Sequence, residues 1–326
     1  MMRDPLSDAT LGVEDLVVEY PLAGGRVLRA VDGVSFDVAA GETLALVGES
    51  GCGKSSIVRA LMQLSPYSRG AVRIGGVDLA KLAPDELKRL RPRFQMIFQD
   101  PISSLNPRRR VRDILEAPLR INRRFDPVAS AKRIREVLEL VGVDPATALD
   151  RYPHEFSGGQ CQRISIARAL VLEPDLLVCD EPVSALDVSV RAQVLNVLNE
   201  LRERLGLSML FITHDLAVVR NVADRVAVMY LGRICEIGEA GEVLDRPAHP
   251  YTACLLSAVP VADPDAGVER VQLTGEIPSP MDVGPGCRFR SRCPAARELC
   301  ARVEPGLTEA GRNRSVACHF PVAAEP

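Results

Sequence analysis

The chain has 326 residues, of which 47% are hydrophobic and 25% charged, with a formal net charge of −3. This composition supports a globular core. The charge gives no footprint for nucleic acid, because the short basic run at Arg108–Arg110 is more typical of a solvated face. No stretch approaches the roughly 20 apolar residues of a membrane span.

The N-terminus argues against secretion. Residues Met1–Thr10 carry Asp4 and Asp8 and no apolar core, so we expect no signal peptide. We therefore expect a chain that is made and kept in the cytosol. Its 9 cysteines are then not expected to form disulfides.

The first predicted elements are strands at 13–20 and 34–38, where apolar and polar residues partly alternate. Residues 43–47 (TLALV) form the continuous apolar run of a strand buried on both faces of a sheet. A glycine-rich turn follows, and then a helical pattern at 55–64. Strand, glycine turn and helix are the context that a phosphate loop requires.

The turn itself, 48–55 (GESGCGKS), matches the pattern G-x-x-x-x-G-K-[ST] in full. Glycines let backbone N–H groups turn toward phosphate oxygens, and the helix N-terminus adds partial positive charge. Lys54 is expected to reach the β- and γ-phosphates of ATP, and the Ser55 hydroxyl to bind Mg²⁺. The residues expected around the nucleotide are Gly48, Glu49, Ser50, Gly51, Cys52, Gly53, Lys54, Ser55 and Ser56. A chance glycine turn before a helix is the weaker alternative.

The later elements continue a β-α alternation. They are a strand at 94–98, a helical region at about 111–172, a strand at 176–179, a helix at 188–205 and strands at 208–212 and 225–229. This order predicts an α/β fold. After about Leu244 proline and glycine become frequent, so we place a domain boundary within 235–250.

Two carboxylates, Asp180 and Glu181, end the buried run 176–179. In an open α/β sheet, that end of a strand faces the ligand crevice. Asp180 suits Mg²⁺ held through water, and Glu181 suits a general base that polarises the attacking water. Many strands end in acidic turns, so the signal gains its weight from the complete phosphate loop upstream.

A second helix start that could face phosphate lies at Ser157–Gln160 (SGGQ). One ATP needs only one phosphate loop. A second N–H-rich helix start makes sense if it serves a nucleotide held by another copy or a partner chain. The alternative is an ordinary helix capped by Ser157.

In the order of these motifs, residues from about 11 to 245 resemble the ABC ATPase family. The resemblance implies a P-loop NTPase of the ABC type: a RecA-like core with an antiparallel β subdomain and an α-helical signature subdomain at about 100–172. It implies a nucleotide-binding domain at 11–240 and two such domains that close head-to-tail around ATP.

The same resemblance implies roles for individual residues. By position in the family motifs, Tyr20 would stack on adenine, and Gln99 would touch Mg²⁺ and the attacking water. The signature would be formed by Ser157, Gly158, Gly159 and Gln160. Asp187 would lie in the D-loop and contact the nucleotide site, and His214 would contact the γ-phosphate. The catalytic set is then Glu181, His214 and Gln99, and the Mg²⁺ set is Ser55, Gln99 and Asp180. One departure is Cys161, which stands where members of the family usually carry arginine. The absence of that arginine removes a positive charge near the partner's nucleotide.

A branch of the family can also be named. Phe98–Pro107 is similar to the extended Q-loop of dipeptide and oligopeptide importers, and His249–Thr252 to the opening of their C-terminal extension. Asp180–Ser189 and Leu273–Pro280 look more like the second, F-type, of the two paired ATPase subunits.

This branch implies an ATPase that drives peptide import, peripheral to the membrane on its cytoplasmic side. Its implied partners are a homologous ATPase in a heterodimer, two membrane permeases and an extracytoplasmic solute-binding protein, with no nucleic acid. Nickel and glutathione importers of the same branch are alternatives. A soluble ABC ATPase of DNA repair or translation, or an exporter ATPase, is a more distant one.

Four cysteines, Cys287, Cys293, Cys300 and Cys318, fall in the predicted extension at 241–326. Their spacings are not those of a common zinc site. Four thiolates suit Zn²⁺ or a [4Fe–4S] cluster. The resemblance to peptide-importer ATPases favours the [4Fe–4S] cluster, with Zn²⁺ and unligated thiols as alternatives. Neighbouring Arg288, Arg290 and Arg292 are expected to favour thiolate over thiol.

Overall fold

The computed structural model describes residues 9–259, 275–281, 283–311 and 313–322. The signal-peptide argument on residues 1–8, and the first two residues of Leu273–Pro280, lie outside this part. The chain divides into two compact units, each assembled from separate segments of sequence. The first unit comprises Met1–Gly12, Asp37–Glu42 and Arg73–Ile212, and the second Val13–Phe36, Thr43–Val72 and Thr213–Pro326.

The first unit is built on three parallel strands, β6 (Phe94–Ile97), β7 (Leu176–Asp180) and β8 (Ser208–Thr213). β7 lies between the other two, with Leu176 opposite both Phe94 and Ser208. Their side chains are almost all buried, as continuous apolar runs in a parallel sheet require. All three strands end at the same edge, which carries Asp180.

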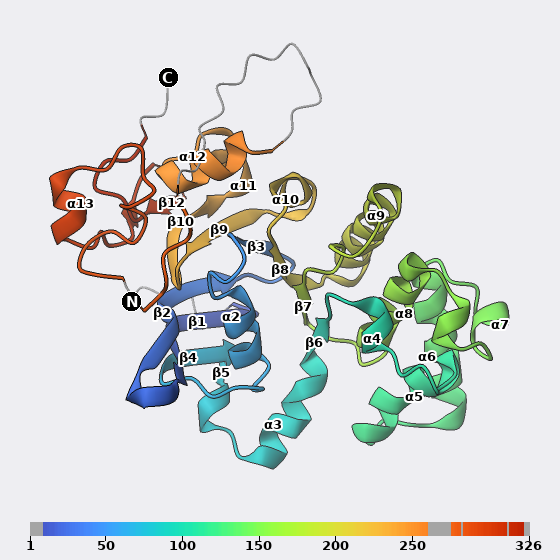
Figure 1. Ribbon diagram of the computed structural model, residues 1–326. Coiled ribbons are helices and arrows are strands. Elements are labelled where there is room, and N and C mark those ends of the chain that lie inside the picture. The colour runs from blue at the N-terminus through green and yellow to red at the C-terminus, as the bar shows by residue number, and fades with distance from the viewer. Residues whose placement is uncertain (1–8, 260–274, 282, 312, 323–326) are drawn as a thin grey trace, which may run out of the picture. The chain divides into compact units, whose positions relative to one another are not determined.

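The helices of the first unit are α3 (Pro84–Leu90), α4 (Pro101–Ser104), α5 (Val111–Ile121), α6 (Pro127–Leu140), α7 (Pro145–Ala148), α8 (Gly158–Leu170) and α9 (Val188–Leu205), and Val77–Asp78 form β5. α8 packs against α4, α5 and α6, and Figure 1 shows α4–α8 gathered in one group. The single helical region predicted at 111–172 is thus several helices. Asp126 and Asp144 divide it, because their carboxylates accept N–H groups at the starts of α6 and α7.

The second unit contains a sheet in the order β11 (Thr308–Glu309), β12 (Arg314–Val316), β10 (Arg233–Glu239), β9 (Arg225–Tyr230) and β3 (Thr43–Val47). β3 and β9 are parallel, whereas β10 is antiparallel to both β9 and β12. A further sheet places β1 (Leu11–Pro21) between β2 (Val27–Val38) and β4 (Arg69–Ile74). The pairing of β12 with β10 joins the last part of the chain to the strand after β9.

The helices of the second unit are α2 (Lys54–Leu61), α10 (Leu216–Val222), α11 (Ala240–Asp245), α12 (Pro250–Ser257) and α13 (Glu298–Arg302). Tyr251 and Phe289 belong to the same buried cluster as Ala45 and Val47 of β3. Residues beyond 240 therefore share an apolar core with the strand that precedes the glycine-rich turn. The domain boundary at 240/241 stays a prediction. No helix in the described part of the chain is long and apolar enough to cross a bilayer.

Candidate nucleotide site

The glycine-rich turn lies between β3 and α2, as predicted, and its glycines are required by space and by backbone conformation. Gly48 and Gly53 have φ of 151° and 110°. A Cβ on Gly48 would lie 2.2 Å from the carbonyl oxygen of Met229, and one on Gly53 would lie 2.3 Å from that of Ala30. Any other residue would push the loop away from β9 and β2. The loop is therefore held close against both sheets of the second unit.

Lys54 is curled into this loop. Its side chain is buried, with the residue 6% exposed, and Nζ donates to the carbonyl oxygens of Gly48 and Glu49 over 2.6 and 3.0 Å. The hydrogen-bond partners of this buried ammonium are the two carbonyl oxygens and the sulfur of Cys52. None of these groups carries the full negative charge that would balance a buried cation. A phosphate group would supply that charge. Ser56 and Ile57 donate their N–H groups to the carbonyl oxygen of Gly53, and the partial positive charge at the start of α2 adds to the attraction for an anion.

The other predicted loop residues fit a nucleotide site in different ways. Ser50, Gly51 and Ser55 are exposed, so their backbone and hydroxyl groups are accessible. A hydroxyl oxygen such as that of Ser55 is a hard ligand of the type Mg²⁺ prefers. Burial raises the pKa of the Cys52 thiol, which stays protonated. The Tyr20 hydroxyl donates to Ser56 Oγ over 3.3 Å, which places Tyr20 beside the start of α2.

Gln99 and Glu181 meet in the first unit. Gln99 Nε2 donates to the Glu181 carboxylate over 3.1 Å. Glu181 has φ of 46°, in the left-handed region. Its N–H donates to Ile212, and its carbonyl oxygen accepts from both the N–H and the hydroxyl of Ser184. This anchoring on both sides holds a conformation that costs energy, which is typical of functional sites.

His214 follows the end of β8 directly and is exposed. Asp180 is the last residue of β7 and is half-buried. Both residues thus lie at the carboxyl ends of parallel strands, as the sequence predicted. Their roles stay predictions.

The predicted signature opens α8. The Ser157 hydroxyl accepts the N–H of Gln160, and the Gln160 side chain accepts the N–H of Ser157. This reciprocal cap fits the ordinary-helix alternative as well as a nucleotide role. Packing also explains why position 159 is glycine, since a Cβ there would lie 2.3 Å from a methyl carbon of Val190 on α9. Asp187 lies exposed before α9 and makes no side-chain cap.

Cys161 is buried in α8, and its sulfur lies 3.4 Å from the carbonyl oxygen of Pro153. The thiol pKa is raised by burial, so the side chain is neutral. The position at which the family resemblance implies an arginine therefore carries no charge here.

The prediction of a [4Fe–4S] cluster is wrong, and Zn²⁺ finds no support either. In the described residues no group of three or more His, Cys, Asp or Glu side chains is placed to hold a metal ion. The four cysteines line a cavity of about 10 Å³, room for about one water molecule. Burial raises the pKa of Cys287, Cys293 and Cys318, so these sulfurs are protonated thiols in the metal-free chain.

Two premises of that prediction fail for physical reasons. The extension has apolar and backbone contacts of its own, because Phe289 enters the apolar core and β12 pairs with β10. Arg292, expected to lower thiol pKa values, instead pairs with Glu49 of the glycine-rich loop. Nothing in the sequence signals this pair, whose members are 243 residues apart.

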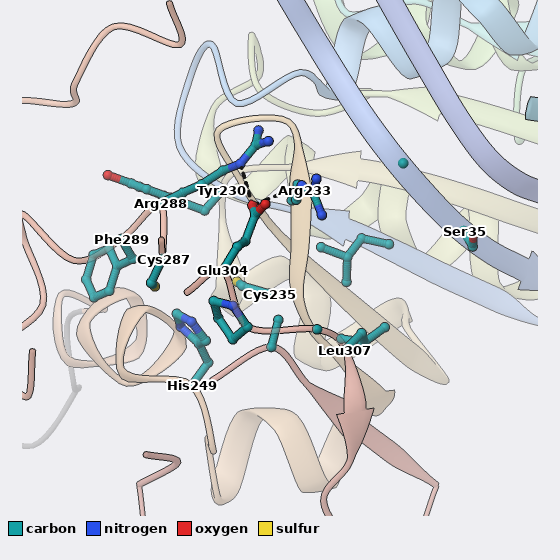
Figure 2. A pocket seen from close by; sticks show the side chains of 15 residues that line it. Ser35, Tyr230, Arg233, Cys235, His249, Cys287, Arg288, Phe289, Glu304 and Leu307 are labelled. Atoms are coloured by element: carbon teal, nitrogen blue, oxygen red, sulfur yellow. Dashed lines mark hydrogen bonds and ion pairs between the residues drawn. The ribbon is translucent and has the colours of Figure 1, made fainter. Parts of the chain in front are cut away.

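A larger cavity of about 240 Å³ adjoins the cysteine-lined one and shares His249, Cys287 and Phe289 with it (Figure 2). Arg233 and Arg288 both turn toward Glu304 in its wall, at 3.1 and 3.0 Å. Both arginines also pair with Asp32. These ion pairs connect the C-terminal residues to β2 without touching the glycine-rich loop.

Comparison with known proteins decides the family. Residues 31–184 match the ABC transporter family, and residues 235–300 match the C-terminal region of oligopeptide/dipeptide transporters. The chain is 48% identical to the oligopeptide transport ATP-binding protein OppF of Escherichia coli over 322 residues, covering 94% of this chain and 95% of that protein. The chain belongs to the ABC transporter family, in its oligopeptide branch. It is therefore an ABC-type ATPase.

Other members of the family agree with this assignment. The oligopeptide transport ATP-binding protein AppF of Bacillus subtilis is 46% identical, with 96% of this chain and 98% of that protein covered. Among solved ABC structures, cbiO1 from Clostridium perfringens aligns with a TM-score of 0.65 at 28% identity, covering 73% of this chain and 91% of that chain. The ATP-binding cassette MJ0796, solved as a dimer bound to ADP and Pi, aligns with a TM-score of 0.63 at 27% sequence identity. The alignment covers 71% of this chain and 98% of that chain. The ABC ATPase fold predicted from the motifs is thus confirmed.

Proposed function

We propose that the chain hydrolyses ATP to drive the import of dipeptides and oligopeptides through an ABC transporter. The observation that carries this proposal is the match along nearly the whole chain, cassette and C-terminal region together, to oligopeptide transport ATP-binding proteins. A soluble ATPase of DNA repair or translation would not need that C-terminal region.

In this proposal the glycine-rich loop holds the triphosphate of ATP. Lys54 leaves its carbonyl partners to bind the β- and γ-phosphates, while backbone N–H groups from Gly51 to Ser55 bind phosphate oxygens. Tyr20 stacks on adenine. Ser55, Gln99 and Asp180 are the residues that hold Mg²⁺, which when bound neutralises charge developing on the phosphates.

Hydrolysis is assigned to three side chains. Glu181 accepts a proton from the attacking water, Gln99 orients that water, and His214 contacts the γ-phosphate. The fixed backbone of Glu181 keeps the carboxylate in one place at the end of β7. A positioned base of this type contributes roughly 10²- to 10⁴-fold to a rate.

The second half of each site comes from another subunit. Ser157–Gln160 and Asp187 are proposed to face ATP held by a homologous ATPase in a head-to-tail heterodimer. We place the pair peripherally on the cytoplasmic side of the cell membrane, on two permeases that receive cargo from an extracytoplasmic solute-binding protein. The segment Phe98–Pro107 follows β6 and contains Gln99, so it can report the nucleotide state to the permeases.

Reconstitution tests this proposal. The chain, its homologous ATPase, the permeases and the binding protein are placed in vesicles, and uptake of labelled di- and tripeptides, nickel and glutathione is measured with ATP. We expect peptide uptake that depends on ATP and is abolished by Glu181→Gln. Uptake of nickel or glutathione without peptide would contradict the assigned cargo while leaving the ATPase assignment intact.

A further inference from the structure

Glu49, the second residue of the glycine-rich loop, is bound by residues from the C-terminal part of the chain. Its carboxylate forms a two-point ion pair with Arg292, Nη1 lying 2.7 Å and Nη2 3.0 Å from the two oxygens. The Arg292 side chain is only 5% exposed and that of Glu49 23%. Paired N–H···O bonds of this kind fix direction as well as position.

The backbone of Glu49 is held as well. Its N–H donates to the hydroxyl of Tyr251 over 3.0 Å. Tyr251 is fully buried, and its ring contacts Tyr230 at 4.7 Å and Phe289 at 5.3 Å between centroids. Burial raises the pKa of Tyr251, so the hydroxyl keeps its proton. The packed rings of Tyr230, Tyr251 and Phe289 thus hold the hydroxyl that accepts the Glu49 N–H in a fixed position.

These contacts act on the same residue as Lys54. Lys54 Nζ donates to the carbonyl oxygen of Glu49, so the N–H, the carbonyl and the carboxylate of Glu49 are all bonded. A carboxylate in a phosphate-binding loop repels the triphosphate unless it is neutralised and turned aside. Arg292 does both, and its guanidinium also lies 5.9 Å from the centre of the Tyr230 ring.

We propose that Arg292 and Tyr251 are positioning residues for ATP binding, through which the C-terminal part of the chain sets the nucleotide affinity of the glycine-rich loop. This rests on the proposed role of that loop. Neither residue touches the nucleotide; both act through Glu49.

Equilibrium binding of Mg-ATP tests the proposal on the full chain, with four variants: Arg292→Gln, Tyr251→Phe, Glu49→Gln and the double variant Glu49→Gln/Arg292→Gln. We expect Arg292→Gln to weaken binding roughly 10- to 100-fold and Tyr251→Phe about 3- to 10-fold. In the Glu49→Gln background, Arg292→Gln should produce no further loss, because the carboxylate through which it acts is gone.

Arg288→Gln is the matched control. Arg288 lies in the same segment, and the variant loses ion pairs with Asp32 and Glu304, but Arg288 has no hydrogen bond or ion pair with the loop. We expect ATP binding within about twofold of the parent, whereas a general loosening of the segment would weaken it as much as Arg292→Gln does. Tyr251→Phe keeps the aromatic packing and remains informative if Arg292→Gln unfolds.

Parent-like binding by Arg292→Gln or Tyr251→Phe would overturn the inference alone. An equal loss from Arg292→Gln with and without the Glu49 carboxylate, or an equal loss from Arg288→Gln, would overturn it too. Absence of ATP binding by the parent chain would instead overturn the proposed function and the inference together.

Discussion

Gln99 and Glu181 occupy matching positions on neighbouring strands. Ile97 of β6 is paired with Cys179 of β7, and Gln99 and Glu181 each come two residues later. The parallel register therefore brings the amide and the carboxylate to the same sheet edge, where they bond over 3.1 Å. Two motifs 82 residues apart in sequence become one site through strand pairing.

Glu181→Gln should remove hydrolysis while keeping nucleotide binding. The introduced amide oxygen can still accept from Gln99, so the local geometry is preserved, but the side chain no longer accepts a proton. We expect the rate of ATP hydrolysis to fall roughly 10²- to 10⁴-fold, with little change in the Kd for ATP. Single-turnover hydrolysis and equilibrium binding measure the two quantities. Parent-like turnover would show that another group is the base.

Ser157→Ala should affect the assembled ATPase more than the isolated chain. Loss of the cap at α8 lowers the free energy of unfolding by about 1 kcal/mol. If Ser157 serves the partner's ATP, hydrolysis by the heterodimer should also fall at least about tenfold, since an oriented hydrogen bond to the reacting charge is lost. ATP binding by the isolated chain should stay unchanged.

Asp126→Ala provides the control, because Asp126 caps α6 through the same kind of contact. It should cost similar stability without reducing hydrolysis. Equal loss of hydrolysis in both variants would mean that Ser157 is only a cap.

Gly53→Ala should damage the loop, and Gly241→Ala should not. An alanine at position 53 places Cβ against the carbonyl oxygen of Ala30 and adopts a positive φ, so we expect a loss of at least about 2 kcal/mol together with loss of ATP binding. Gly241 lies in α11, where an added Cβ would meet nothing within 4 Å, so alanine there should stabilise the chain by up to about 1 kcal/mol. Chemical denaturation measures both effects.

His249 should make the protein less stable in mild acid. Burial lowers its pKa from 6.5 to about 4, opposed in part by a hydrogen bond to the backbone of Ala317. Between these values the unfolded chain binds a proton that the folded chain does not, so the free energy of unfolding falls as pH drops through this window. Above pH 7 the imidazole is neutral in both states and contributes nothing. The full effect is about 3 kcal/mol.

His249→Asn tests this. Nδ1 of His249 accepts the N–H of Tyr251 at the start of α12, and asparagine can accept at the same capping position without titrating. The difference in unfolding free energy between parent and variant should change between pH 7 and pH 4, as measured by urea denaturation. A constant difference across this range would contradict the assigned pKa.

Sequence alone identified the elements whose signal is local. The apolar runs of β3, β7 and β8 and the glycine-rich loop were all predicted, because burial on both faces and phosphate binding each leave a short pattern. Glu181 and Gln99 followed from motif position. Their approach to each other needed the strand register as well.

The strands and helices that were missed depend on distant partners. β10 contains Glu236, a charge that argues against a buried strand. In the fold its carboxylate accepts the N–H groups of Ala248 and His249 at the start of the next segment, and burial raises its pKa. The grip of Arg292 on Glu49 is likewise invisible in sequence. For the cysteines the sequence predicted a site that the fold does not support, because four thiols close in sequence resemble a set of metal ligands.

The antiparallel pairing of β12 with β10 has a consequence for protein engineering. Trimming the chain after Glu239 would bare the edge of β10 and would uncover Tyr230 by removing Tyr251 and Phe289, which pack on its ring. An exposed strand edge beside an exposed apolar surface favours aggregation. The tail is therefore not an interchangeable module that could be transplanted onto another cassette. A chimera would have to carry Glu49, Tyr230 and the edge of β10 from the cassette together with the tail that contacts them.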